Sequence, residues 1–140
     1  MPARDKGGYK MTTVEANGYT FITDDTTGTK TAKGPMKDEA ASREAIPKGA
    51  GGSLKQAGDQ YGHILAARFD GPTIKENISN QQGKLNQGAY KRMENAEAAL
   101  LKDGAKIQTE RIAYSHGKAK DGSVRPDVYM INDTVIYQNG

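Results

Sequence analysis

The sequence DQYGHILAA at residues 59–67 predicts a short strand that carries a histidine and runs into an apolar segment. A Gly-Pro turn follows at residues 71–72, and a segment rich in Asn and Gln extends over residues 77–87. Residues 86–103 then predict the longest helix of the chain, because apolar side chains recur at three- and four-residue spacing and Gly104 supplies a stop. This order places a histidine and an asparagine-led helix on two walls of one site.

Composition limits what the chain can be. Its 140 residues and 35% hydrophobic content suffice for one core and argue against two ordinary domains. The formal net charge of +3 permits nucleic-acid binding without requiring it. No cysteine is present, which excludes disulfides, thiolate metal sites and cysteine nucleophiles. Because no apolar run approaches the ~18 residues of a membrane span and no signal peptide opens the chain, we expect a soluble domain that a carrier would export.

The N-terminal part predicts strands. Residues 18–23 and 29–33 are rich in β-branched and aromatic side chains, and the turn residues between them indicate a hairpin. Residues 36–46 are compatible with a short helix. The polar residues 1–16 lack periodicity and predict a flexible arm, so we assign a single domain to residues 17–140.

The C-terminal part adds further strands to the long helix. A strand is expected at residues 106–114, followed by a loop at 115–123 that could hang over a substrate. A final hairpin is expected from 127–131 and 134–137, joined across Asn132-Asp133. The whole pattern predicts an α+β fold with an antiparallel sheet and one long helix.

His63 is the candidate catalyst. A lone histidine beside an apolar run is more often a structural residue than a catalyst, but several polar residues follow it in the sequence. Asn77, Gln81, Asn86 and Glu94 are separated by four, five and eight residues, and a purely structural loop has no evident need for so many amides. Asparagine is a neutral oxygen ligand that suits Mg²⁺. The plain alternative is that Asn86 only caps the helix.

This segment resembles a known metal-site signature. From Asn77 through Gln81 and Asn86 to Glu94 it is similar to the DNA/RNA non-specific endonucleases, the Serratia-nuclease-like branch of the His-Me finger (ββα-metal) superfamily. The family pattern is Asn-x-x-Pro-Gln, four residues, Asn-x-Gly, a bulky aromatic and Glu, and its register is kept over all eighteen positions. Residues 62–66, GHILA, resemble the Gly-His-Leu-Ile-Ala of short bacterial members, which often form the C-terminal toxin tips of secreted proteins.

The resemblance implies a role for each matching residue. His63 becomes the general base and Asn86 the single protein ligand to the metal. Glu94 lies two helical turns beyond Asn86, a rise of roughly 12 Å, so it more plausibly bonds water around the metal than the metal itself. Asn77 would orient or buttress the histidine side and Gln81 the loop, although both could equally be loop-closing amides.

The resemblance also implies the chemistry. It predicts a ββα-metal core that uses one Mg²⁺, which Mn²⁺ can replace. Water activated by the histidine would attack the phosphodiester in line and leave 5′-phosphate ends, on DNA and RNA with little sequence preference.

Two departures from the pattern bear on charge. Tyr61 stands where the larger relatives place an arginine, and Asn80 replaces the proline before the glutamine. A phenol donates one hydrogen bond to a phosphate and brings no charge, so a cation must come from elsewhere. We expect Arg125, beside a proline, to supply it in preference to Arg68. Further candidate phosphate contacts, each of which could be only a solvated surface charge, are Lys84, Lys91, Arg92, Lys118 and Lys120.

A second hypothesis is a catalytically degenerate module that binds nucleic acid or a protein partner on the same fold. Binding alone would need neither His63, Asn86 nor Glu94 in this register, which argues against it. A toxin tip implies delivery into a target cell by a carrier or secretion system and a cognate immunity protein, with no membrane partner.

Overall fold

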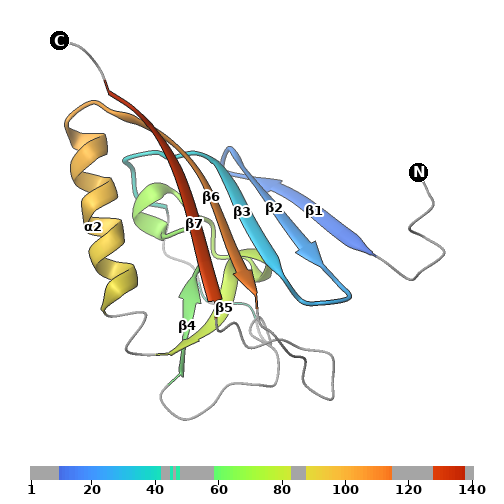
Figure 1. Ribbon diagram of the computed structural model, residues 1–140. Coiled ribbons are helices and arrows are strands. Elements are labelled where there is room, and N and C mark those ends of the chain that lie inside the picture. The colour runs from blue at the N-terminus through green and yellow to red at the C-terminus, as the bar shows by residue number, and fades with distance from the viewer. Residues whose placement is uncertain are drawn as a thin grey trace.

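The computed structural model describes residues 10–41, 45, 47, 59–82, 88–114 and 128–137, except for the side chains of residues 59–61 and 80–82. Within them the chain forms a five-stranded antiparallel sheet, β1-β2-β3-β6-β7, a two-stranded sheet of β4 and β5, and the helix α2 (Figure 1). The bounds are β1 Met11–Ala16, β2 Tyr19–Asp24, β3 Lys30–Pro35, β4 Asp59–His63, β5 Ile78–Gln82, α2 Ala89–Lys102, β6 Lys106–Tyr114 and β7 Val128–Ile136. The expected α+β class, with an antiparallel sheet and a long helix, is confirmed.

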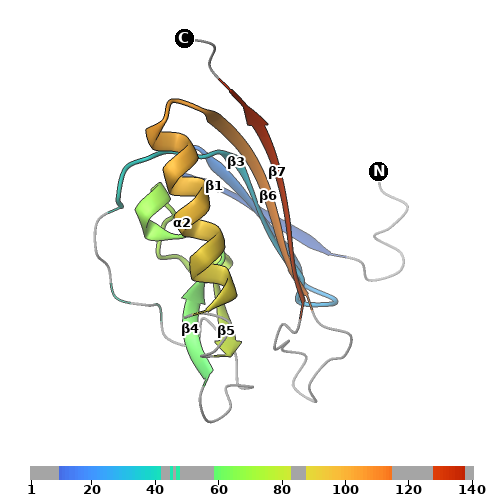
Figure 2. The same ribbon diagram turned by 60° about the vertical axis from the view of Figure 1, so that its left-hand side comes forward.

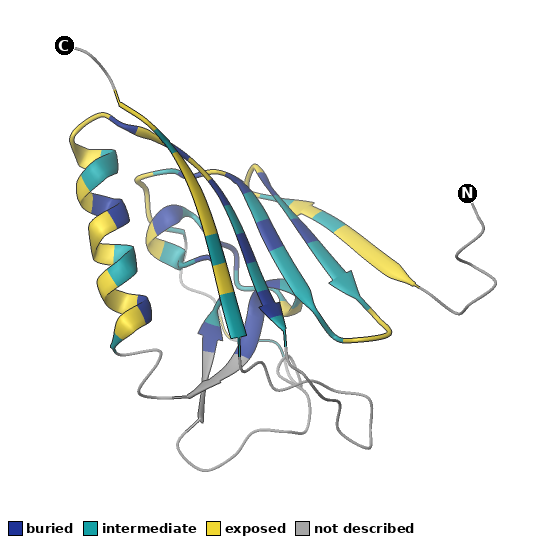
Figure 3. Ribbon diagram, viewed as in Figure 1, coloured by how far each residue is buried: buried dark blue, intermediate teal, exposed yellow. Residues whose placement is uncertain are grey.

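One face of the large sheet carries the rest of the molecule. Helix α2 and the β4–β5 sheet lie against this face, and no described element covers the other (Figure 2). Along β6, buried residues alternate with more exposed ones, which is the period-two pattern of a strand with one covered face. The buried residues gather on this inner side of the sheet and on the facing side of α2 (Figure 3). The largest buried apolar side chains of the core are Tyr19, Phe21, Ile64, Leu65, Phe69 and Ile107.

Helix α2 ends as the sequence predicts. Gly104 adopts a φ of 93°, a left-handed conformation that favours glycine. The N–H of Gly104 bonds to the carbonyl of Leu101, and that of Ala105 bonds to the carbonyl of Leu100, both at 3.0 Å. These two bonds form a Schellman motif, which satisfies the last helical carbonyls and turns the chain into β6.

The expected arm at residues 1–16 is corrected at its end. Met11–Ala16 form the edge strand β1, which pairs with β2 from Met11↔Asp24 to Ala16↔Tyr19. The turn between them places Asn17 and Gly18 at φ values of 55° and 84°, as a tight two-residue hairpin requires. Polar composition concealed this strand because it is mostly exposed, and β2 alone supplies its hydrogen bonds.

The expected final hairpin is also corrected. Residues 128–136 form a single strand, β7, which pairs with β6 and runs straight through the proposed turn. Asn132 lies opposite Glu110, and Asp133 lies opposite Thr109. The Thr109 hydroxyl donates to Asp133 Oδ1 at 2.6 Å, so a cross-strand bond engages the side chain that would otherwise favour a turn.

The short helix expected within residues 36–46 is absent over its described part, residues 36–41. Backbone N–H groups there bond to other elements: Met36 to the carbonyl of Ile107 at 2.8 Å, and Ala41 to that of Ala67 at 2.7 Å. These backbone groups are thus satisfied by tertiary bonds and not by the bonds of a helix. Among the described residues, no helix is long and apolar enough to cross a membrane.

Candidate active site

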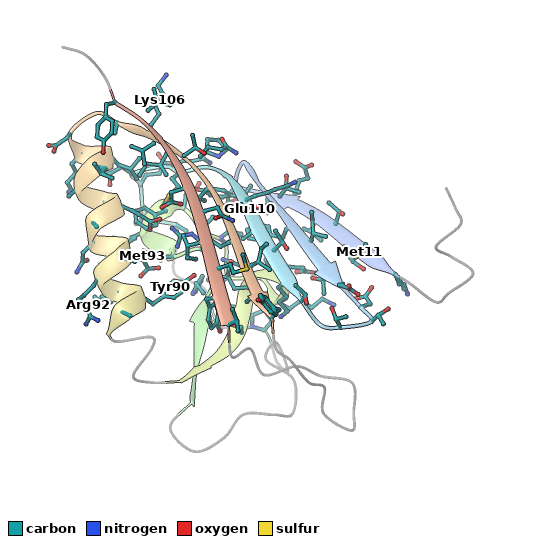
Figure 4. All side chains as sticks on the ribbon, in the orientation of Figure 1. Met11, Tyr90, Arg92, Met93, Lys106 and Glu110 are labelled. Atoms are coloured by element: carbon teal, nitrogen blue, oxygen red, sulfur yellow. The ribbon has the colours of Figure 1, made fainter. Side chains whose placement is uncertain are left out.

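Strands β4 and β5 and helix α2 form one ββα unit. The two strands are antiparallel, with His63 opposite Ile78, and a bond from Ile64 N to Asn77 O at 2.8 Å extends the pairing. On the first turn of α2, Tyr90 points toward the sheet (Figure 4) and donates its hydroxyl to the carbonyl of Ile64. This bond fixes the start of the helix against the residue that follows His63.

His63 ends β4 in a half-buried position. Its Nε2 lies 3.0 Å from the Thr73 hydroxyl, and this contact orients the ring. Burial lowers the pKa of His63 below its usual 6.5, because desolvation disfavours the charged imidazolium. The ring is therefore neutral near pH 7, the state that a general base needs.

Asn77 supports the loop that follows His63. Its side chain is fully buried, accepts a hydrogen bond from Leu65 N and donates to the carbonyls of Leu65 and Pro72, each at 2.9 Å. The loop folds back so tightly that a Cβ on Gly71 would lie 1.9 Å from Leu65 O. This geometry favours the buttressing role for Asn77 over contact with a substrate, because both of its polar atoms are occupied by backbone.

Glu94 and Arg68 lie near one another at α2. The Glu94 side chain is 14% exposed, and burial raises its pKa while the charges of Arg111, Arg68 and Lys91 oppose that rise. Arg68, in the 3₁₀ turn η2 (Ala67–Phe69), donates to Asn95 Oδ1 at 2.7 Å. The loop after His63 thus brings a cation to the helix that carries the acidic residue.

Sequence reasoning missed the buried pair formed by Arg111 and Glu97. Arg111 has no exposed surface, and its Nη2 donates to Glu97 Oε2 on α2. The signal was present: alternation over residues 106–114 places position 111 on the covered face of the strand, where an arginine requires a carboxylate. Glu97 was visible as an acidic residue close to the apolar face of the helix.

The remaining predicted residues divide into two groups. Lys91 and Arg92 are exposed on α2, and Arg92 points away from the sheet (Figure 4). The backbones of Tyr61 and Gln81 lie in the paired strands β4 and β5. The residues or side chains that lie outside the described part of the chain are those of Tyr61, Gln81, Lys84, Asn86, Lys118, Lys120 and Arg125.

The donors that a metal would meet are oxygen atoms. Among the described residues, no three His, Cys, Asp or Glu side chains converge to hold an ion. Glu94 is a half-buried carboxylate on the helix that follows Asn86, and an oxygen donor of this kind suits a hard cation that keeps most of its water. The residues present are therefore compatible with Mg²⁺.

A family model described as DNA/RNA non-specific endonuclease matches residues 10–121, which include the ββα unit with His63 and Glu94. A search of curated proteins returns no match to the chain.

Proposed function

The chain belongs to the DNA/RNA non-specific endonuclease family, and on that premise we propose that it is a Mg²⁺-dependent enzyme that hydrolyses DNA and RNA to 5′-phosphate ends. The observation that carries the proposal is the ββα unit. In it, a neutral, oriented histidine ends β4, and the hydroxyl of Tyr90 joins the next residue to the helix that bears Glu94.

His63 begins the reaction. The neutral imidazole takes a proton from a water molecule, whose oxygen attacks the phosphorus in line as the bond to the leaving 3′ oxygen breaks. Thr73 holds the ring during this transfer, and Asn77 keeps the loop between Leu65 and Pro72 in place. The 5′ oxygen stays on the phosphate and the leaving 3′ oxygen takes up a proton from solvent water, so the products carry 5′-phosphate and 3′-hydroxyl ends.

The metal would be held on the helix side, by Asn86 with Glu94 bonded to the surrounding water, as the family resemblance implies. When bound, Mg²⁺, or Mn²⁺ in its place, supplies charge stabilisation at the phosphate and the leaving oxygen. Burial raises the pKa of Glu94, and the charges of Arg111, Arg68 and Lys91 oppose that rise, so these cations support the ionised form that accepts hydrogen bonds from water.

Positive charge for the phosphate would come from several side chains. Arg68 lies beside Glu94 and Asn95 and is a described candidate. Arg125, Lys84 and Lys118 remain proposals from the sequence, with Tyr61 and Gln81 as neutral contacts to the substrate. We also propose that the domain is a bacterial toxin, delivered by a carrier or secretion system and blocked by an immunity protein. The resemblance of residues 62–66 to toxin-type members supports this.

The test is cleavage by the purified chain of plasmid DNA and of RNA, with Mg²⁺ and with EDTA. We expect both substrates to be cut with Mg²⁺ only, and end-labelling to find 5′-phosphates. Binding of nucleic acid without cleavage in any divalent cation would instead identify a degenerate binding module and overturn the proposal.

A further inference from the structure

Arg111 lies within β6 on the sheet face that α2 covers, with no exposed surface. Besides Glu97, its guanidinium bonds Thr109 Oγ1 at 3.2 Å and contacts Met36 Sδ at 3.7 Å. A buried charged pair is unfavourable compared with apolar side chains of similar volume, so a purely structural role explains this one poorly. In addition, Arg111 Nη1 and Glu97 Oε1 have no hydrogen-bond partner within the described part of the chain.

The nitrogen without a partner is the one nearest the candidate site. Arg111 Nη1 lies 4.0 Å from Glu94 Oε2, while Nη2 bonds Glu97. Glu94 and Glu97 are three residues apart on α2 and therefore share one face of the helix. One guanidinium thus lies against both carboxylates.

Other charged side chains also act on Glu94 and Glu97. Arg68 from η2 and Lys91 from α2 also lower the pKa of Glu94, and Arg111 has the largest such effect. Asp133 from β7 acts on Glu97 and, together with burial, raises its pKa to about 8 against the opposing charge of Arg111. Arg111 is thus the cation that lies within 4.0 Å of both carboxylates.

Arg111 is also a neighbour of the contact that joins the two walls. Its charge acts on the phenol of Tyr90, whose hydroxyl donates to Ile64 next to His63. The same guanidinium therefore lies behind Glu94 and behind the first turn of α2.

We propose that Arg111 is a positioning residue for the nuclease: from inside the sheet its guanidinium contacts Glu94 and orients that carboxylate on α2, while Glu97 and Thr109 keep the guanidinium in place. This inference rests on the proposed function for its effect on cleavage. The charge pairing itself does not, and it is tested separately.

The main variant is Arg111→Met combined with Glu97→Leu, which removes the buried pair as a unit and leaves no charge behind. The carboxyl carbon of Glu94 is titrated by NMR in the full chain, with and without the double change. We expect Glu94 to titrate at higher pH in the variant. Plasmid cleavage should fall about 10–100-fold, as for loss of a group that orients a metal-site residue, and the acid side of the pH–rate profile should move to higher pH.

Two further variants separate positioning from simple support of the fold. Arg111→Lys keeps the positive charge at this position and should retain most of the cleavage activity of the unaltered chain. In a Glu94→Gln background the double change should cost little more, because its effect acts through Glu94, whereas a merely structural loss would add in full. Lys106→Met, an exposed change at the start of the same strand (Figure 4), is the control and should cleave like the unaltered chain.

The outcomes are distinct. If the Met/Leu variant does not fold, Arg111→Gln with Glu97→Gln gives a neutral pair that can still hydrogen-bond, and takes its place. An unchanged Glu94 titration, or a loss of cleavage that adds in full to that of Glu94→Gln, overturns the inference. If the unaltered chain cuts neither DNA nor RNA, the proposed function fails, and the titration alone decides whether Arg111 holds Glu94.

Discussion

The two walls of the candidate site are held by different forces. The wall of His63 rests on the neutral amide of Asn77, whose oxygen and nitrogen both bond to backbone. The wall of α2 rests on charges, with Arg111 between Glu94 and Glu97. Neutral hydrogen bonds do not change with pH, whereas the charged cluster responds to protonation and to cations. Hydrogen bonds that are independent of pH therefore hold the loop after His63, whereas charges hold the helix that carries Glu94.

Removing the base should give the largest effect. His63→Ala is expected to lower cleavage about 10²–10⁴-fold, because it removes the proposed proton acceptor. Thr73→Val should cost less, since it removes only the group that orients the ring. Cleavage rates of the two variants on plasmid DNA are compared, and urea unfolding verifies that both are folded. Near-normal turnover in His63→Ala would remove the general base from the mechanism.

Loss of the Asn77 hydrogen bonds should lower the stability of the fold more than it lowers cleavage. Asn77→Ala leaves two carbonyls and one N–H without their partner, which should lower the free energy of unfolding by roughly 3 kcal/mol. Asn95→Ala, at an exposed position of α2, is the matched control and should change it by less than about 0.5 kcal/mol. Equal effects of the two changes in urea unfolding would contradict the buttressing role.

The Arg68 side chain lies between the loop after His63 and helix α2, and its role can be compared with that of Arg125. Its guanidinium already donates a hydrogen bond to Asn95, so fewer of its N–H donors are available to a phosphate. We expect Arg125→Ala to lower cleavage more, by about 10²-fold, than Arg68→Ala, and Tyr61→Arg to restore part of the Arg125 loss. Cleavage rates of the single and double variants decide, and a normal rate for Arg125→Ala excludes that residue.

The helix wall should control the response to metal. Asn86→Ala is expected to raise the Mg²⁺ concentration needed for half-maximal cleavage and to lower the maximal rate. Glu94→Gln should act in the same way but more mildly, about 10-fold within the usual ~10–100-fold range for a residue that binds through water. Mg²⁺ titrations of both variants measure this. If neither variant changes the metal dependence, the roles taken from the family are wrong.

The smallest expected effect is the pH response of the charged wall. Glu97 has a pKa of about 8 in the folded chain, above the usual value of 4.5, so folding favours its protonated form. The resulting stability is complete below pH 4.5 and is lost as pH rises through 8. The free energy of unfolding in urea should therefore decline between pH 4.5 and about 8, and Glu97→Gln should remove this decline. The same decline in both proteins would assign it to another group.

Patterns over a few residues were enough to predict some of the elements. The strand that carries His63, the stop at Gly104 and the bounds of β6 all agree with the structure, because alternation, apolar spacing and glycine conformation act over a few residues. The register from Asn77 to Glu94 indicated the family, which the match over residues 10–121 confirms. A spacing motif is likewise a local property of the chain.

The hydrogen-bond partners of the remaining residues could be identified from the three-dimensional structure alone. The exposed strand β1 exists through its pairing with β2, and β7 stays straight through Asn132-Asp133 because β6 lies beside it. Asn77 takes its supporting place because the loop after His63 folds around its amide. Arg111 and Glu97, fourteen residues apart, meet inside the core because α2 packs on β6. In each case the hydrogen bond is made with another segment of the chain, and residue propensity and spacing do not predict which segment that is.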